Sequence, residues 1–477
     1  MSNQYIMGID SGSQSTKVVI FDIEGNELAY GSSSLKETLS PEPGVVVHPD
    51  DDLWDSLYEA VNRCLNDFEG DRKEIIGIGL CTIRCCRVLL DEHGNLAHPV
   101  ISWMDTRLSK PYEHTDDRVH YVTTTSGYLG LKLTGQYNDT AANYEVFWPV
   151  NRETLDWSTD DEEIAAHGLR RDILFNLVKP GEELGTLRGD LAKEFGLNEN
   201  VSVVATANDK AVEALGSGIH DEHSIMISLG TFISSMMLRE TYFENATNFF
   251  PTFASIPYQY AYESNGIRRG LWTVSWFKKL IGEELVKEAE KAGISEEEFL
   301  NRKATEIPAG SDGLFTVLDW LASPDTPYRK GMMIGFDQRH TRYHIYRSIL
   351  EAIAYEMKNN IDTMAKEIGV EVNDIVVIGG GSKSDLMMQI LSDVFGLPTY
   401  RRTGSSSACV GAAICASRSL GIYEDFNSAI HQMVKTESEF TPDAHAHSFY
   451  TKVNEHVVKH IRKHTDEVAK LIYPIFN

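Results

Sequence analysis

The sequence predicts an α/β protein made of two related domains, and two observations carry this prediction. The 477 residues exceed what one hydrophobic core supports, so two domains of about 200–250 residues are expected. An apolar strand that ends in a glycine and a hydroxyl residue, and leads into a second strand, occurs at 5–13 and again at 224–231. A chance match of short strands is the alternative. The boundary falls near 219–223, giving domains at 1–220 and 221–477.

Strand and helix patterns follow one another along the chain. The first half predicts hairpins over 5–35, a helix over 50–68, and strands at 75–80, 87–90 and 201–205. The second half predicts a strand at 224–231, a helix over 342–365, and a strand, glycine turn and helix over 374–397. The apolar residues of 105–170 show no clear helical or strand period. The acidic stretch 155–163 is expected to form a surface exposed to solvent.

Composition excludes several classes of partner. The net charge of −26, from 70 acidic and 44 basic residues, disfavours nucleic-acid and membrane-surface partners, although backbone N–H groups could still hold an anionic nucleotide. No apolar run approaches the ~20 residues that span a bilayer. The first residues lead directly into a strand pattern, so no signal peptide is expected. Six cysteines without a CxxC pair indicate reduced thiols and a cytoplasmic protein.

Three turns that combine glycine with hydroxyl residues each follow an apolar strand. They are Asp10-Ser11-Gly12-Ser13-Gln14, Gly230-Thr231 and Gly379-Gly380-Gly381-Ser382. Glycine lets the backbone approach an anion and offer N–H donors, and a neighbouring hydroxyl adds another donor. Neither a P-loop nor a Rossmann fingerprint is present. Any one of these could be an ordinary tight turn, but three of them favour a nucleotide phosphate site.

Asp10 closes the first strand and is assigned to Mg2+, because a carboxylate beside bound phosphates requires a cation between them. The alternative is a turn-forming aspartate that bonds its own backbone. Lys17 is open to two interpretations of equal weight, a phosphate contact or a surface side chain.

Together these motifs resemble the FGGY carbohydrate kinases of the actin/hexokinase-like superfamily, and the resemblance covers almost the whole chain. Gly8–Lys17 looks like the first phosphate motif of that family, and Trp103-Met104-Asp105-Thr106-Arg107 is similar to its sugar-side W-x-D-x-R. Ala207-Asn208-Asp209-Lys210 matches the segment with the catalytic aspartate, and Ser228–Thr231 resembles the second phosphate motif. Val377–Gln389 with Ser407–Ala413 looks like the adenosine-side signature.

The resemblance implies two actin/hexokinase-like (ribonuclease-H-like) domains with an interdomain cleft, and ATP-dependent phosphorylation of a hydroxyl on a small sugar, sugar acid or polyol. Asp209 would be the catalytic base and lie near the metal with Asp10. The remaining ATP-binding residues implied are Gly12, Ser13, Gln14, Lys17, Gly230 and Thr231 at the phosphates, and Gly380, Gly381 and Ser384 at the adenosine. The alternative for Asp209 is a helix N-cap.

The sugar side departs from the family pattern. Arg84 is placed like a polyol-contacting arginine, with a structural ion pair as its alternative, but Cys85 stands where a polar sugar-reading residue is usual. Trp103 and Asp105 are the other expected substrate contacts. Leu133-Thr134-Gly135 follows Arg107 after only about two dozen residues, so the aromatic lid of relatives is shortened or absent. Tyr121, Tyr128 and Trp272 are possible substitutes for it.

Two other functions stay open at this point: a non-catalytic ATP- and sugar-binding regulator, and a different actin-like ATPase. Retention of Asp10, Asp209 and Thr231 speaks against the first, and the W-x-D-x-R segment against the second. The sequence does not name the substrate. The apolar spacing of 448–470 fits a homodimer contact and a packed terminal helix equally well.

Overall fold

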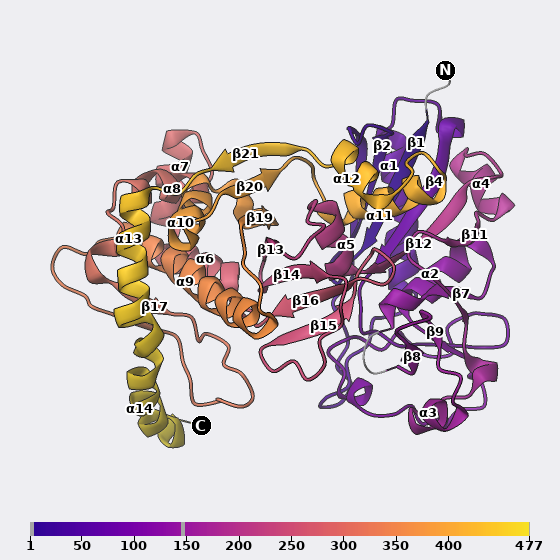
Figure 1. The fold of residues 1–477 in the computed structure, drawn as a ribbon, viewed down its shortest axis with the longest axis horizontal. Coiled ribbons are helices and arrows are strands. Elements are labelled where there is room, and N and C mark those ends of the chain that lie inside the picture. Colours follow the sequence, from indigo (N-terminus) through magenta and orange to yellow (C-terminus); the bar gives the residue numbers. More distant parts are fainter. Residues whose placement is uncertain (1–3, 145–147, 477) are drawn as a thin grey trace.

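The computed structural model describes residues 4–144 and 148–476. Residues 1–3, on which the expectation about the N-terminus partly rests, lie outside this part of the chain. Figure 1 shows two groups of strands and helices, one formed mainly by the first half of the chain and one mainly by the second.

The described residues of the first half form a six-stranded mixed sheet in the order β11-β12-β4-β1-β2-β3. Its strands are β1 (Tyr5–Ser11), β2 (Ser15–Asp22), β3 (Glu27–Ser34), β4 (Ile75–Thr82), β11 (Glu183–Thr186) and β12 (Ser202–Asn208). Strands β1, β2 and β3 are antiparallel neighbours, whereas β4 runs parallel to both β1 and β12. The predicted hairpins and strands of this half are confirmed.

The described residues of the second half form a seven-stranded sheet in the order β15-β16-β14-β13-β19-β20-β21. Its strands are β13 (Ser224–Leu229), β14 (Ile233–Arg239), β15 (Phe249–Phe253), β16 (Tyr260–Ser264), β19 (Asp374–Ile378), β20 (Thr399–Arg402) and β21 (Thr436–Phe440). In both sheets an antiparallel hairpin, β1–β2 or β13–β14, lies beside a parallel strand, β4 or β19. The repeated motif therefore occupies the same place in each half.

The helices agree with the periodic patterns. The longer ones are α1 (Asp52–Asp67), α2 (Thr125–Thr134), α5 (Asp209–Gly216), α6 (Gly270–Ile281), α7 (Glu283–Ala292), α8 (Glu296–Thr305), α9 (Arg342–Ile368), α10 (Asp385–Phe395), α11 (Ser407–Ser419) and α12 (Phe426–Met433). The chain ends in α13 (Ala444–Val453), a π-helical turn (Asn454–Val458) and α14 (Lys459–Phe476), which extends away from the sheets in Figure 1. Residues 448–470 are thus helical, with a π turn that the sequence pattern did not predict.

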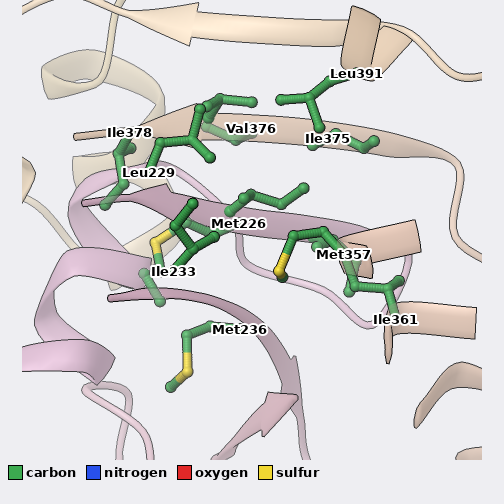
Figure 2. Packing of buried hydrophobic residues seen from close by; sticks show 14 of the residues in the cluster. Met226, Leu229, Ile233, Met236, Met357, Ile361, Ile375, Val376, Ile378 and Leu391 are labelled. Atoms are coloured by element: carbon green, nitrogen blue, oxygen red, sulfur yellow. The ribbon is translucent and has the colours of Figure 1, made fainter. Parts of the chain in front are cut away.

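The core of the second half lies between its sheet and the helices α9 and α10. The apolar residues of β13, β14 and β19 belong to this core, consecutive ones such as Ile225, Met226 and Ile227 included, and all are fully or almost fully buried. Figure 2 shows Met226 of β13 near Met357 of α9, and Val376 of β19 near Leu391 of α10. Burial of such side chains contributes roughly 1.5–3 kcal/mol each, which fixes the strand ends that carry the glycine turns.

Helix α11 belongs to the second half by sequence but packs on the sheet of the first half. A Cβ on Gly8, Gly79 or Gly216 would approach backbone carbonyl oxygens of α11 at 2.1, 2.0 and 1.8 Å, respectively. The absence of a side chain at these glycines lets the helix backbone lie directly on β1, β4 and α5. The two halves are therefore joined by a packed helix as well as by the chain.

Residues 84–144 and 148–182 lie between β4 and β11 and, besides α2, form short elements. They are β5 (Val88–Leu90), β6 (Tyr121–Thr123), β7 (Asn138–Thr140), β8 (Val150–Asn151), β9 (Asp156–Trp157), α3 (Asp161–Ala166) and β10 (Asn176–Val178), and α4 (Gly189–Phe195) follows β11. In the second half β17 (Phe315–Val317) pairs with β18 (Met332–Ile334). Most of the acidic stretch 155–163 is exposed, as expected, although Leu155 is buried.

Candidate active site

The first glycine turn joins β1 to β2 and carries an acidic and a basic side chain. Asp10 and Lys17 are partners in the antiparallel register, and the Lys17 Nζ lies 3.5 Å from the Asp10 Oδ2. The backbone N–H of Gly12 closes the turn by donating to the carbonyl of Ser15. Burial raises the pKa of the Asp10 carboxyl, and the positive charge of Lys17 opposes this effect. Asp10 is therefore a carboxylate whose charge is incompletely compensated.

The tip of this turn is open. Ser13 and Gln14 are exposed, and Gly12 is partly exposed, whereas Ser11 and Thr16 on either side are buried. A turn of this kind presents backbone N–H groups and a hydroxyl to an incoming anion. The structure thus places the three predicted phosphate contacts at one accessible loop, beside Asp10 and Lys17.

The second and third glycine turns lie side by side, because β13 and β19 are parallel neighbours. A Cβ on Gly379 would lie 2.6 Å from the carbonyl oxygen of Leu229, and a Cβ on Gly381 would lie 2.8 Å from the Cβ of Leu229. Thr231 is exposed, and a Cβ on Gly380 would meet no atom within 4 Å. These two turns consequently form one surface at the same edge of the second sheet.

Ser384 makes hydrogen bonds within the fold that the sequence did not predict. It caps the N-terminus of α10, accepting a hydrogen bond from the backbone N–H of Met387 at 3.2 Å. Its hydroxyl donates to the Asn301 Oδ1 at 3.0 Å, and the same oxygen accepts from the Tyr346 hydroxyl. This serine fixes the helix that follows the third turn.

Asp209 begins α5 at the end of β12. The residue that caps this helix is Asn208, whose Oδ1 accepts from the backbone N–H of Ala211 at 3.1 Å. The amide nitrogen of Asn208 donates to the Thr252 Oγ1 of β15 at 3.0 Å, which joins the helix start to the second sheet. The N-cap alternative for Asp209 is therefore wrong, because its neighbour already fills that role.

The Asp209 carboxylate has an unusual electrostatic environment. Its side chain is 22% exposed, and the Arg84 Nε lies 3.8 Å from its Oδ1. Burial raises the pKa of Asp209 to about 6; Arg84 and Lys210 lower this pKa, whereas Glu213 and Asp10 raise it. Because the charge of Asp10 acts on the pKa of Asp209, the carboxyl-terminal ends of β1 and β12 belong to one site. A carboxylate of this pKa can accept a proton near neutral pH.

Glu263 is a site residue that sequence reasoning missed. It lies on β16 of the second sheet, and its Oε2 accepts from the Arg84 Nη2 at 2.5 Å. The side chain of Glu263 is only 8% exposed. The sequence does show a glutamate within the apolar strand Tyr260–Ser264, and a buried carboxylate there needs a positively charged partner. The sequence does not show which residue that partner is.

Lys210 and Glu213 complete the group of charges around Asp209. The Lys210 Nζ lies 2.7 Å from the Glu213 Oε2, one turn along α5. We call the whole group of ionisable side chains at the meeting of the two sheets the junction cluster; it consists of Asp10, Lys17, Arg84, Asp209, Lys210, Glu213 and Glu263.

Asp105 is fully occupied by internal hydrogen bonds. Its carboxylate accepts from the backbone N–H of Val46 at 2.7 Å, and from the backbone N–H, Nε and Nη2 of Arg107 at 2.9, 2.9 and 2.7 Å. No surface of this side chain is exposed. The prediction that Asp105 contacts substrate is not supported by this geometry, because no carboxylate oxygen faces outward; Asp105 instead positions Arg107. Trp103 is 52% exposed and leaves an indole face open.

Of the aromatic residues considered as a substitute lid, the two tyrosines do not supply one. Tyr128 is buried and donates its hydroxyl hydrogen bond to Asp51, and Tyr121 packs against Tyr137 and Phe175. The guanidinium of Arg269 lies over the Trp272 ring at 4.7 Å. The first two tyrosines therefore belong to the packing of the first half.

A metal site built from protein ligands alone is not found in the part of the chain that the structure describes. No group of three or more His, Cys, Asp and Glu side chains there is arranged to hold an ion. Mg2+ in phosphate-transfer sites needs only one or two carboxylates, because phosphate oxygens and water supply the other ligands. The carboxylate of Asp10, buried beside an open glycine turn, fits that requirement.

Two further observations bear on the setting of the protein. Within residues 4–144 and 148–476, no helix combines the length and apolar character needed to cross a membrane. None of the six cysteines, which lie inside these ranges, forms a disulfide bond.

Two similar sheets, each with a glycine turn at a hairpin, and a buried aspartate of raised pKa where they meet are the features expected of a phosphotransferase of the two-domain sugar kinase class. The chain belongs to the FGGY family of carbohydrate kinases. The N-terminal domain model of this family matches residues 5–116 and 108–216, and the C-terminal domain model matches residues 225–420. It is therefore an enzyme that transfers a phosphoryl group to an alcohol acceptor.

Similar proteins are sugar kinases of several kinds. The chain is 43% identical over its full length to an uncharacterized sugar kinase, YgcE, of Escherichia coli strain K12, covering 97% of that protein. It is 26% identical to a xylulose kinase of Staphylococcus epidermidis (ATCC 35984), with 100% of both chains covered. An autoinducer-2 kinase of Enterobacter sp. strain 638 is 25% identical, with 94% of this chain and 92% of that protein covered.

Solved structures of the same fold include gluconate kinase from Lactobacillus acidophilus, with a TM-score of 0.81 at 18% identity, covering 98% of this chain and 99% of the other. Glycerol kinase from Plasmodium falciparum has a TM-score of 0.78 at 17% identity, covering 96% and 98%. At these identities the likeness shows the fold alone, which is the actin/hexokinase-like two-domain fold that the sequence predicted.

Proposed function

We propose that this kinase uses ATP and Mg2+ to phosphorylate a hydroxyl of a small sugar or polyol, with Asp209 as the catalytic base. The observation that carries the proposal is the Asp209 carboxylate, which lies at the start of α5 with its pKa raised to about 6 and with Arg84 at 3.8 Å. A base of this kind holds a proton during transfer and releases it afterwards at neutral pH.

The chemical step is an in-line transfer. The acceptor hydroxyl donates its proton to a carboxylate oxygen of Asp209 as its own oxygen forms a bond to the γ-phosphorus of ATP. The bond between that phosphorus and the β,γ-bridging oxygen breaks, and ADP leaves with the electron pair. Arg84 orients the acceptor and balances part of the charge of Asp209, and the exposed indole of Trp103 offers an apolar face for the carbon skeleton.

The nucleotide is assigned to the glycine turns. Gly12, Ser13, Gln14 and Lys17 would hold phosphate oxygens from the first half, while Gly230 and Thr231 would do so from the second. Gly380 and Gly381 would approach the adenosine, with Ser384 fixing the helix behind them. The adjacency of the second and third turns supports a shared ligand.

Mg2+ is assigned to Asp10, through water, with Asp209 nearby. When bound, the ion neutralises charge on the transferring phosphates. Asp10 raises the pKa of Asp209, so a cation bound between the two carboxylates would stabilise both in their ionised forms.

The wider assignments follow from the same proposal. Residues 1–220 would form the sugar-side domain and residues 221–477 the ATP-side domain, with closure completing the site only when the acceptor is bound. Use of ATP and six cysteines outside any disulfide bond favour a cytoplasmic enzyme. A homodimer would use α14, where Val468, Leu471 and Ile475 are exposed.

A coupled ADP-release assay tests the proposal. The panel should contain pentuloses, hexuloses, polyols and sugar acids, because the similar proteins are named for different substrates. Asp209→Asn should lower kcat by about 100-fold or more and leave ATP affinity within a few-fold, since the amide cannot take the proton.

The matched control is Asp172→Asn, a same-type change at an exposed ion pair with Arg170. It should retain parental kinetics. If Asp209→Asn phosphorylates the preferred acceptor at the parental rate, the assignment of the base is wrong.

A further inference from the structure

The junction cluster contains no cation without an acidic partner among the described residues that form it. Arg84 pairs with Glu263 and approaches Asp209, Lys210 pairs with Glu213, and Lys17 pairs with Asp10. Three cations thus face four carboxylates. With every group ionised, the cluster carries one net negative charge before any ligand enters.

Glu263 is the member that the chemistry of phosphoryl transfer does not require. It comes from β16 of the second sheet and reaches Arg84, which follows β4 of the first sheet. Its neighbours in the register are Met236 and Phe250, so the strand provides an apolar setting for a charged side chain. Burying a carboxylate there is costly without a partner, and a buried pair of this kind specifies geometry more than it adds stability.

We propose that Glu263 is a specificity-determining residue that commits Arg84 to recognising an uncharged acceptor, so that the enzyme phosphorylates neutral sugars or polyols and rejects sugar acids. This inference rests on the proposed function and narrows its acceptor class. Glu263 acts through Arg84, and it is therefore a positioning residue.

The physical basis is a difference in charge balance. A sugar carboxylate near Arg84 would compete with Glu263 for the guanidinium and would add a negative charge to a cluster that is already negative. A neutral hydroxyl can instead accept from Arg84 and donate to a carboxylate without displacing the existing pair. Discrimination of this kind works by repulsion of the wrong substrate as well as by attraction of the right one.

The test compares matched neutral and acidic acceptors of equal chain length in the ADP-release assay, for example D-xylulose, xylitol and D-glucitol against D-xylonate and D-gluconate. The parent enzyme should prefer the best neutral acceptor over the best acid by about 100-fold or more in kcat/KM, the effect of one close charge at intermediate dielectric. Glu263→Gln should narrow this ratio by about tenfold or more, mainly through a lower KM for acids.

Two variants separate this role from a purely structural one. Glu263→Asp keeps the charge and should restore rejection of acids, whereas a general loss of folding would change both acceptor classes equally. Glu240→Gln, the same chemical change at an exposed residue that follows β14, should leave the ratio unaltered.

The outcomes are distinct. The inference is overturned if the parent enzyme prefers acidic acceptors. It is also overturned if the ratio of kcat/KM for neutral acceptors to that for acidic acceptors is the same in Glu263→Gln and in the parent. Either result leaves the kinase assignment intact. If neither the neutral nor the acidic acceptors support ADP release although MgATP still binds, the proposed function fails, and the inference fails with it.

Discussion

A Cβ atom on Gly8 would lie 2.1 Å from the carbonyl oxygen of Cys409, although the two residues belong to opposite halves of the chain. Gly8 lies in the middle of β1, two residues before Asp10, and Cys409 lies in the first turn of α11. This contact sets the position of the strand that carries the first phosphate turn.

Gly8→Ala should therefore destabilise the protein by ~2–4 kcal/mol, because the obstructing atom is backbone and cannot rotate away. Denaturant unfolding measures the loss. Gly189→Ala, at the first residue of α4 with no atom within 4 Å of its Cβ, is the control and should be neutral or slightly stabilising. Equal stability of both variants would show that the close approach of α11 is absent in solution.

The pH dependence of turnover should follow the ionisation of Asp209. Because the base must be deprotonated, kcat/KM for the acceptor should fall about tenfold per pH unit below the pKa of Asp209 and level off above it; this pKa is about 6 in the cation-free site and is lowered by bound Mg2+. A discontinuous ADP measurement over roughly pH 5–9 avoids coupling enzymes that have their own pH limits. A kcat/KM that rises as the pH falls towards 5 would exclude Asp209 as the base.

Asp209→Asn should raise the stability of the ligand-free protein at pH 8. The pKa of Asp209 is higher in the folded state than its usual value of 3.8, so the folded protein binds this proton more tightly than the unfolded chain. Stability due to this group is present at low pH and is lost as pH rises towards 6, so the ionised form costs ~1–3 kcal/mol above that point.

Thermal unfolding at pH 8 and pH 4 checks this linkage. The variant should be more stable than the parent at pH 8, and the difference should shrink at pH 4, where the parent carboxyl is protonated. A difference of the same size at both values would point to a cause other than ionisation.

Asp105→Asn distinguishes a positioning role from a substrate contact. Burial raises the pKa of Asp105, but hydrogen bonds from Arg107 and Val46 outweigh it and lower the pKa overall. Stability from this group is consequently present above its usual pKa and is lost as pH falls below it. At neutral pH the variant should lose ~1–3 kcal/mol in denaturant unfolding. An unchanged stability together with a raised KM for the acceptor alone would restore Asp105 to the substrate site.

Much of the fold could be predicted because its signals are local. The repeated hairpin, the 3.6-residue period of α1 and α9, and the glycine turns each depend on neighbouring residues, and their elements formed where expected. The sequence motif predicted Asp209 as a site residue. Its alternative role as the N-cap of α5 is excluded because Asn208 caps that helix.

The features that the sequence did not predict depend on contacts between residues far apart in the chain. Arg84 and Glu263 are 179 positions apart, and nothing in the local sequence of either pairs them. Asp105 sits in a motif that indicates sugar binding, yet its oxygens are taken up by Val46 and Arg107. In the same way, no local pattern shows that α11 leaves its own sheet to pack on the other one.

The crossing of α11 also bears on how the chain is made. Apolar side chains of the first sheet, including Ile6, Val19 and Val204, share a core with Cys409, Ile414 and Ile430. During synthesis from the N-terminus, this face of the first sheet lacks the cover of α11 and α12 until residues beyond 430 have emerged from the ribosome. The N-terminal half should therefore mature late, and a chimaera joined near residue 220 would cover its first sheet with α11 and α12 of a different relative.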